Sequence, residues 1–175
     1  MMSRDRIRER LRWYGPVEML NAALVPAVMA IWCGYEEQEI GWLLVLTCMP
    51  MCLLLLIGGQ YWRAKLQQLD GNSQPMQRFL PLADRSRPIL LVLCAVALAA
   101  AILGWLDIGI GRSLGERIAA SIAATLAVLE YVNYYHRQLQ HFDHAPDFRR
   151  LLTGQGFRPA QMAVDLARWR DAGAK

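Results

Sequence analysis

The sequence predicts an all-α integral membrane protein, a four-helix bundle with both termini in the cytoplasm. Of its 175 residues, 55% are hydrophobic and only 19% are charged, whereas a soluble domain usually carries about 25% charged residues. The apolar residues also gather in four blocks. Each block has about 20 residues or more, the length that a helix needs to cross roughly 30 Å of bilayer hydrocarbon.

The four predicted spans cover residues 14–35, 40–62, 88–110 and 117–138. The alternative is a soluble bundle with buried helices. Residues 88–106 argue against it because they include no charged side chain, and a helix of a soluble bundle shows a polar face. The first block is too long for the core of a signal peptide and lacks a clear small-residue cleavage site, so we expect a retained span.

The Lys and Arg residues predict the orientation of these spans. Residues 1–13 hold five of them, residues 63–87 hold five, and the chain from Arg137 onward holds seven. The other two connections hold only Arg112 and Arg117. Short cytoplasmic loops carry the excess of positive residues. We therefore expect both termini inside, in a bacterial-type inner (plasma) membrane.

The chain divides into three predicted regions. Residues 1–13 form a basic amphipathic lead-in, residues 14–139 form the four-span bundle, and residues 140–175 form an amphipathic cytoplasmic tail. The tail is too short for a core of its own. The basic residues flank the spans, which favours anionic lipid headgroups as partners and argues against nucleic acid. Self-association or a second membrane protein is a further expected partnership.

Small residues recur every fourth position in the third and fourth spans. They are Ala97 and Ala101 in the third, and Ala119, Ala123 and Ala127 in the fourth. Small residues at this spacing let membrane helices approach closely. We therefore expect these two spans to pack against each other. At the span ends, Trp13, Tyr61 and Trp62 are predicted as interfacial aromatics.

Polar side chains gather near the cytoplasmic ends of the first and fourth spans. The candidate ligand cluster comprises Glu18, Asn21, Gln60, Glu130, Asn133, His136 and Arg137. At 1.5 Å per residue, five of them fall within a slab about 10 Å thick: Glu18, Asn21, Gln60, Glu130 and Asn133. A helical wheel places Glu130, Asn133 and Arg137 on one face, with His136 at its flank. A carboxylate inside the membrane is costly unless it is paired or protonated, which indicates a functional site.

The alternative for this cluster is structural. Arg12, Arg137 or Gln60 could pair with the carboxylates and lock helix to helix. The sequence leaves both interpretations open.

Metal binding and redox chemistry are weaker hypotheses, and we expect neither a metal nor a cofactor. The histidines are His136, His141 and His144, with Asp143 and Asp147 beside them. Their spacing does not align all three on one helix face, so they predict interfacial polar residues. The cysteines Cys33, Cys48, Cys52 and Cys94 all fall inside predicted spans, where small apolar packing is the better interpretation. No phosphate loop, nucleophile elbow or zinc-protease helix motif appears.

The sequence favours a non-enzymatic function. We expect a small membrane protein that assembles with itself or a partner, or that handles a small solute or ion. The alternative is an intramembrane or lipid-modifying enzyme that uses Glu130, Glu18 and His136 at the cytoplasmic leaflet. One carboxyl group would then act as general acid or base.

Overall fold

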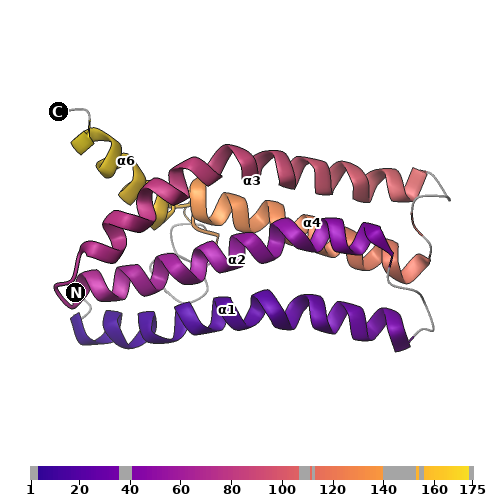
Figure 1. Cartoon of the computed structure of the whole chain (residues 1–175), viewed down its shortest axis with the longest axis horizontal. Helices are drawn as coiled ribbons and strands as arrows, with labels where there is room; N and C mark the ends of the chain where they lie inside the picture. The colour runs from indigo at the N-terminus through magenta and orange to yellow at the C-terminus, as the bar shows by residue number, and fades with distance from the viewer. Residues whose placement is uncertain are drawn as a thin grey trace.

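The computed structural model describes residues 4–35, 41–106, 111, 113–139, 153 and 156–173. These residues form five helices and no strand: α1 (Arg4–Tyr35), α2 (Trp42–Leu69), α3 (Gln74–Leu106), α4 (Leu114–Tyr135) and α6 (Gln161–Gly173). Helices α1 to α4 run antiparallel to one another in chain order, and α6 lies at the end that carries the α2–α3 turn (Figure 1). The predicted all-α class is confirmed, and α1 to α4 are each long and apolar enough to cross a membrane.

The helices α2 and α3 are longer than the spans predicted for them. They contain 28 and 33 residues, so they are about 42 and 50 Å long at 1.5 Å per residue. The predicted connection 63–87 is helical except for the turn at 70–73. The reason is its amphipathic pattern, because Arg63 is exposed while Ala64 and Phe79 are buried. Helices with such a face continue beyond the last uncharged stretch.

The turn between α2 and α3 has a glycine where the backbone requires one. Gly71 has a φ of 93°, in the left-handed region that favours glycine. Its N–H donates to the Gln68 carbonyl at 3.2 Å, and the Asn72 N–H donates to the Gln67 carbonyl at 2.9 Å. This is the Schellman arrangement, which satisfies the last carbonyls of α2. It holds the first turn of α3 next to the last turn of α2.

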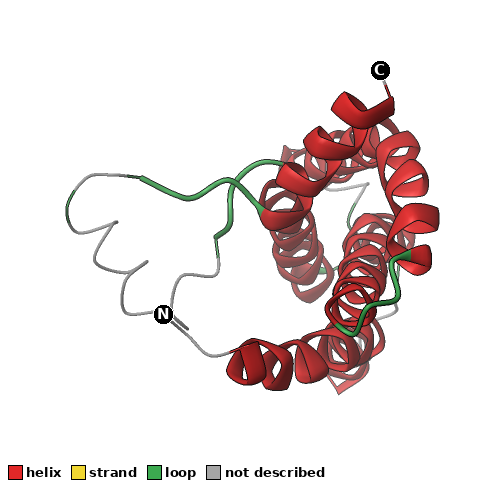
Figure 2. Ribbon diagram, turned by 90° about the vertical axis from the view of Figure 1, so that its left-hand side faces the viewer, coloured by secondary structure: helices red, strands yellow, loops and turns green. Residues whose placement is uncertain are grey.

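Helix α2 packs against α1, α3 and α4, and Figure 2 looks along the axes of the bundled helices. The predicted contact between the third and fourth spans is confirmed, since Ala97 and Ala101 of α3 are buried with Ala124 of α4. Ala120 of α4 packs against Leu43 of α2. The predicted small residues of α4 are also fully buried: Ala119, Ala123 and Ala127.

Apolar side chains cover the outward faces of all four long helices. Exposed examples are Val17, Leu24 and Ile31 of α1, Val45 and Leu56 of α2, Val92 and Ile102 of α3, and Ile122 and Leu129 of α4. A bundle in water would carry polar residues at such positions. The outer surface therefore suits a lipid environment.

Helix α4 ends at Tyr135, before the end predicted at residue 138. The N–H groups of His136 and Arg137 both donate to the Val132 carbonyl, at 3.0 and 2.8 Å. The Asn133 side-chain oxygen accepts from the Leu139 N–H at 2.9 Å. These bonds satisfy the helix terminus and turn the chain away, so Arg137 no longer shares a helix face with Asn133.

Beyond α4, residues 136–139 run beside residues 158–160. The Gln138 N–H donates to the Arg158 carbonyl at 2.9 Å, and the Ala160 N–H donates to the His136 carbonyl at 3.1 Å. The two segments lie side by side as loops in Figure 2. They bring the start of α6 back to the end of α4.

Helix α6 packs on α3 and α4 and binds α2 through a buried carboxylate. Asp165 accepts hydrogen bonds from the Tyr61 hydroxyl at 2.8 Å and from Lys65 Nζ at 2.6 Å. Met162 and Leu166 are buried in the main core. The prediction of Tyr61 as an interfacial aromatic is wrong, because this side chain is fully buried and binds α6. The predicted tail thus ends in a docked helix.

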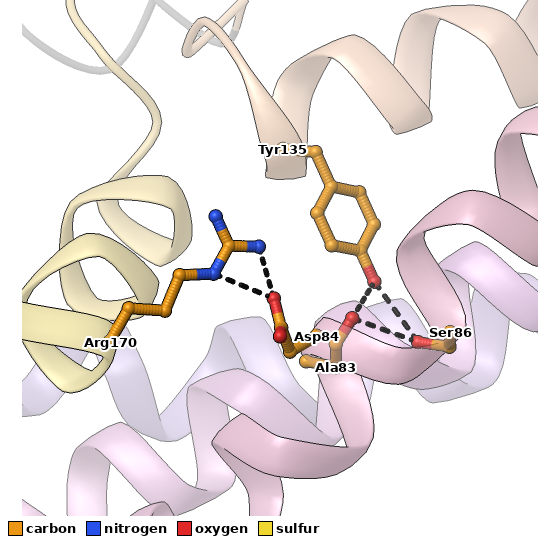
Figure 3. A network of polar contacts seen from close by, with 5 residues as sticks. All are labelled: Ala83, Asp84, Ser86, Tyr135 and Arg170. Atoms are coloured by element: carbon orange, nitrogen blue, oxygen red, sulfur yellow. Dashed lines mark hydrogen bonds and ion pairs between the residues drawn. The ribbon is translucent and has the colours of Figure 1, made fainter. Parts of the chain in front are cut away.

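A second set of polar contacts joins α3 to both α4 and α6 (Figure 3). Arg170 donates from Nε to the Asp84 carboxylate at 2.9 Å. The Tyr135 hydroxyl donates to the Ala83 carbonyl at 3.0 Å and lies 3.2 Å from the Ser86 hydroxyl. One turn of α3 therefore holds the end of α4 and the end of α6.

Candidate functional site

Two glycines bring α1 and α2 into close contact. A Cβ built on Gly59 would lie 2.7 Å from Cγ of Met19 and 3.1 Å from the Gly15 carbonyl oxygen. A Cβ built on Gly15 would lie 2.9 Å from Cγ of Arg63. Small residues at such a crossing let the two backbones approach. The crossing places Glu18, about one turn after Gly15, in the interior with only 7% of its surface exposed.

Tyr134 of α4 reaches toward the same place across a third glycine. A Cβ on Gly58 of α2 would collide with the Tyr134 hydroxyl and ring, so the ring occupies the space of a missing side chain. The hydroxyl is buried and makes no hydrogen bond of normal geometry with the described residues. Glu18 is the acceptor that it approaches.

Glu130 and Asn133 form the α4 side of the site. The Asn133 amide donates from Nδ2 to Oε2 of Glu130 at 3.3 Å, and both side chains are half-buried. Helices α1 and α4, which carry Glu18 and Glu130, are in contact with each other. Glu18, Glu130, Asn133 and Tyr134 are referred to below as the Glu18–Tyr134 cluster.

Neither carboxylate of this cluster forms an ion pair with another described residue. Within the described part of the chain, the ion pairs join Arg8 to Asp70, Lys65 to Asp165 and Arg170 to Asp84. The expected alternative, in which an arginine neutralises Glu18 or Glu130, is therefore not the arrangement of the described residues. The cluster combines two carboxyl groups, an amide and a hydroxyl within an apolar bundle. Such groups can share a proton or coordinate a small cation.

The other members of the predicted site lie around this cluster. Asn21 is half-buried, one turn beyond Glu18. Gln60 is exposed on α2. His136 and Arg137 are exposed beyond the end of α4, where Arg137 donates to the Phe157 carbonyl at 3.2 Å. The structure therefore brings together three of the seven predicted residues and leaves the other four at its margin or outside.

Tyr134 was missed by the sequence analysis. It lies four residues after Glu130, on the same face of α4, and this spacing was a usable signal. The second half of the signal was the pair Gly58–Gly59 at the matching depth of α2. A glycine pair opposite a tyrosine indicates where an aromatic ring can enter a helix contact.

Glu116 is another buried carboxylate that the sequence analysis missed, and its role is structural. Helix α2 begins after Gly41, which offers no side-chain cap. Glu116 of α4 supplies the missing acceptor, since Leu44 N–H donates to its Oε1 at 3.3 Å. A Cβ on Gly41 would overlap this carboxylate. A negative charge at a helix N-terminus stabilises the free N–H groups. The signal was the sequence SLGE, in which Ser113 also caps α4.

The predictions on histidines and cysteines concern residues away from the cluster. His141, His144, Asp143 and Asp147 lie outside the described residues. Among those described, no group of three metal-binding side chains occurs. The four cysteines are free thiols: Cys33, Cys48 and Cys94 are buried and Cys52 is half-buried. The Cys48 sulfur contacts the Met29 sulfur at 3.9 Å, which is the expected apolar packing.

Comparisons with known proteins add no relative. No protein family matches the sequence, and no curated protein and no solved structure is significantly similar to it. The functional argument therefore depends on the geometry of the cluster.

Proposed function

We propose that this chain is a multi-pass protein of a bacterial-type inner membrane, and that it passes a proton or a small monovalent cation through the Glu18–Tyr134 cluster. The observation that carries the proposal is the pair of inward carboxylates, Glu18 and Glu130, without a cationic partner among the described residues. An ionisable group of this kind inside a membrane is rare, and it typically marks an ion or proton pathway.

Membrane insertion is supported by the outward faces of the four long helices. These faces expose leucine, valine and isoleucine along α1 to α4. Each helix has at least 22 residues, enough to cross roughly 30 Å of hydrocarbon. Contiguous exposed apolar surface of this extent is unusual for a soluble monomer.

The orientation with both termini inside is supported by charge. All but two of the 19 Lys and Arg residues lie in the lead-in, in 63–87 or after α4. The start of α1, the α2–α3 turn and α6 lie at one end of the bundle (Figure 1). Positive residues favour the cytoplasmic side, and anionic headgroups would attract them there.

The placement of the cluster favours exchange with the cytoplasm. Glu18 lies five residues after Trp13, which is 70% exposed and marks the interface in this arrangement. That separation corresponds to about 7.5 Å along the helix. Glu130 and Asn133 are half-buried near the end of α4, where His136 is exposed. Glu130 lies five residues before the end of α4, at a similar depth to Glu18, so an ion arriving from the cytoplasm would meet the half-buried Glu130 and the more enclosed Glu18 at one level of the bundle.

The enzymatic alternative needs His136 beside the two carboxylates. In the structure His136 is exposed past the end of α4, with its ring 5.6 Å from that of Tyr131. An imidazole placed there suits the mouth of a pathway better than a reaction centre between Glu18 and Glu130. The cluster accordingly supports ion handling over lipid modification.

A flux assay tests the proposal. The purified protein is reconstituted into liposomes that contain a trapped pH indicator, and parallel samples receive radioactive sodium outside. We expect proton or sodium flux from the wild type, and at least a tenfold loss in Glu18→Gln and Glu130→Gln. Glu9→Gln is the matched control, because Glu9 is exposed at the start of α1. Equal flux in all three variants, or no flux above empty liposomes, would overturn the proposal.

A further inference from the structure

A cavity of about 450 Å³ opens where α2, α3 and α6 meet. It belongs to the cytoplasmic extensions of the helices in the proposed orientation, and it shares no residue with the Glu18–Tyr134 cluster. Its polar lining comes from all three helices and from the turn: Lys65, Gln68, Ser73, Gln77, Asp165 and Arg168. Small-molecule sites typically have volumes of about 300–1,000 Å³.

The charge available to a ligand in this cavity is positive. Asp165 is occupied, because it accepts from Tyr61 and from Lys65 at 2.8 and 2.6 Å. Arg168 is exposed and makes no hydrogen bond or ion pair with the described residues. Among the described residues, nothing occupies its guanidinium group on the cavity wall. A planar guanidinium binds phosphate or carboxylate oxygens through two parallel hydrogen bonds.

The rest of the lining supplies neutral donors and an apolar surface. Gln68 and Gln77 carry amides that can donate to oxygen atoms. The half-buried Trp169 and the buried Met76 and Leu80 also line the cavity. A ligand that fills the cavity therefore needs an anionic end and an apolar end.

We propose that this cavity binds a phosphate ester, with the phosphate on Arg168 and the organic group against Trp169. The ester could be a soluble phosphorylated metabolite or the headgroup of a phospholipid. Lys65 lies three residues beyond Trp62, about 4.5 Å farther along α2. The headgroup layer is about 5–7 Å thick on each side of the hydrocarbon, so a lipid phosphate can reach this depth. The inference does not depend on the proposed ion function.

The soluble source is tested by calorimetric titration of the full-length protein in phospholipid-free detergent. Phenyl phosphate is the probe, and inorganic phosphate serves as the anion without an apolar group. If the source is soluble, phenyl phosphate binds and inorganic phosphate binds at least several-fold more weakly. Arg168→Gln should weaken phenyl phosphate by about tenfold to a hundredfold, the effect of losing a charge-assisted hydrogen bond.

The lipid source is tested by native mass spectrometry in mild detergent. The protein is mixed with phosphatidylglycerol or with a diacyl glycolipid that has no phosphate. If the source is lipid, one phosphatidylglycerol is retained per chain, and Arg168→Gln lowers its retention about tenfold relative to wild type. The glycolipid should be retained equally by both proteins.

Two further variants make the result specific. Arg85→Gln removes the same charge from an exposed position on α3 outside the cavity, and should bind like the wild type. Gln77→Leu removes a lining amide without changing the charge, and should weaken the phosphate ester several-fold. If Arg168→Gln alone loses binding of phenyl phosphate or of phosphatidylglycerol, the proposal is supported and the ligand bound identifies the source. If Arg168→Gln and Arg85→Gln lose binding equally, or if the wild type binds neither ligand, the proposal is overturned.

Discussion

Replacing Asp165 by alanine should release α6 from the bundle while α1 to α4 stay folded. Asp165 is the polar centre of the docking contact, since both Tyr61 and Lys65 donate to it. The apolar part of the contact, Met162 and Leu166, is unchanged by the substitution. The effect should therefore be confined to the helix that carries the mutation.

The magnitude depends on which of the two donors can recover water. The Tyr61 side chain is fully buried, so losing its acceptor should cost about 1–3 kcal/mol. The Lys65 side chain is 18% exposed, so its ammonium group regains part of its hydration, and we assign it about 1 kcal/mol. The sum is about 2–4 kcal/mol of docking free energy, or a shift of about 30- to 1,000-fold in the docking equilibrium.

Hydrogen exchange measured by mass spectrometry on a peptide from α6 reports this equilibrium. A released helix of 13 residues is only marginally stable in water, so undocking exposes its amides to exchange. Asp165→Ala should speed exchange of α6 by the factor above and leave α2 and α3 protected. Asp171→Ala is the matched control, because Asp171 is exposed on the same helix. Equal exchange in the two variants would refute the assignment of Asp165 as the docking residue.

Three further substitutions test packing inside the bundle. Gly58→Ala should lower the melting temperature in detergent by an amount equivalent to about 1–3 kcal/mol, because the Tyr134 ring that packs on this glycine must move. Gly34→Ala is the control and should be near neutral, because a Cβ there meets no neighbour. Glu116→Ala should cost about 1–3 kcal/mol of unfolding free energy, since it removes the acceptor at the start of α2, and a melting curve like that of the wild type would contradict this role. Ala123→Leu should cost about 1–3 kcal/mol by overpacking, and the interface assignment fails if Leu53→Ala, at a side chain 39% exposed, has the same effect in the same thermal melt.

Much of the architecture follows from hydropathy and small-residue spacing. The stretch 88–106 has no charge, so it predicts a long apolar helix, and α3 contains it. The alanines of the last two spans predict a close contact, and Ala124 of α4 is indeed buried with Ala97 and Ala101. These features are local in sequence or depend on regular spacing, so a single chain displays them.

The helix ends and the docking of α6 were not predictable in the same way. The span predicted from hydropathy ends at Trp62, before the first charged residues. Helix α2 continues to Leu69 because one of its faces remains apolar. Tyr61 looks like an interfacial aromatic until a carboxylate 104 residues later, Asp165, is placed against it. Such contacts depend on tertiary packing that periodicity does not encode.

The candidate site was predicted only in part, because one of its members is placed by tertiary packing. Glu18 and Glu130 were identified from their unfavourable position in apolar helices, and Asn133 from its spacing. The contribution of Tyr134 required the crossing at Gly58 to be known. Carboxylates in apolar segments can be recognised in a sequence. The position of a hydroxyl that packs over a glycine of another helix is known only from the fold.

Infrared difference spectroscopy of the carboxyl groups tests the central claim most directly. The reconstituted protein is cycled between two pH values, and then between sodium and a large organic cation at constant pH. If the cluster binds a proton or a small cation, the wild type shows a carboxyl band that changes with one of the two exchanges. This change should be lost in both Glu18→Gln and Glu130→Gln, and it should be kept in Glu9→Gln. A wild-type spectrum without such a change, or one that both cluster variants preserve, would contradict the assignment of Glu18 and Glu130 as an ion-binding site.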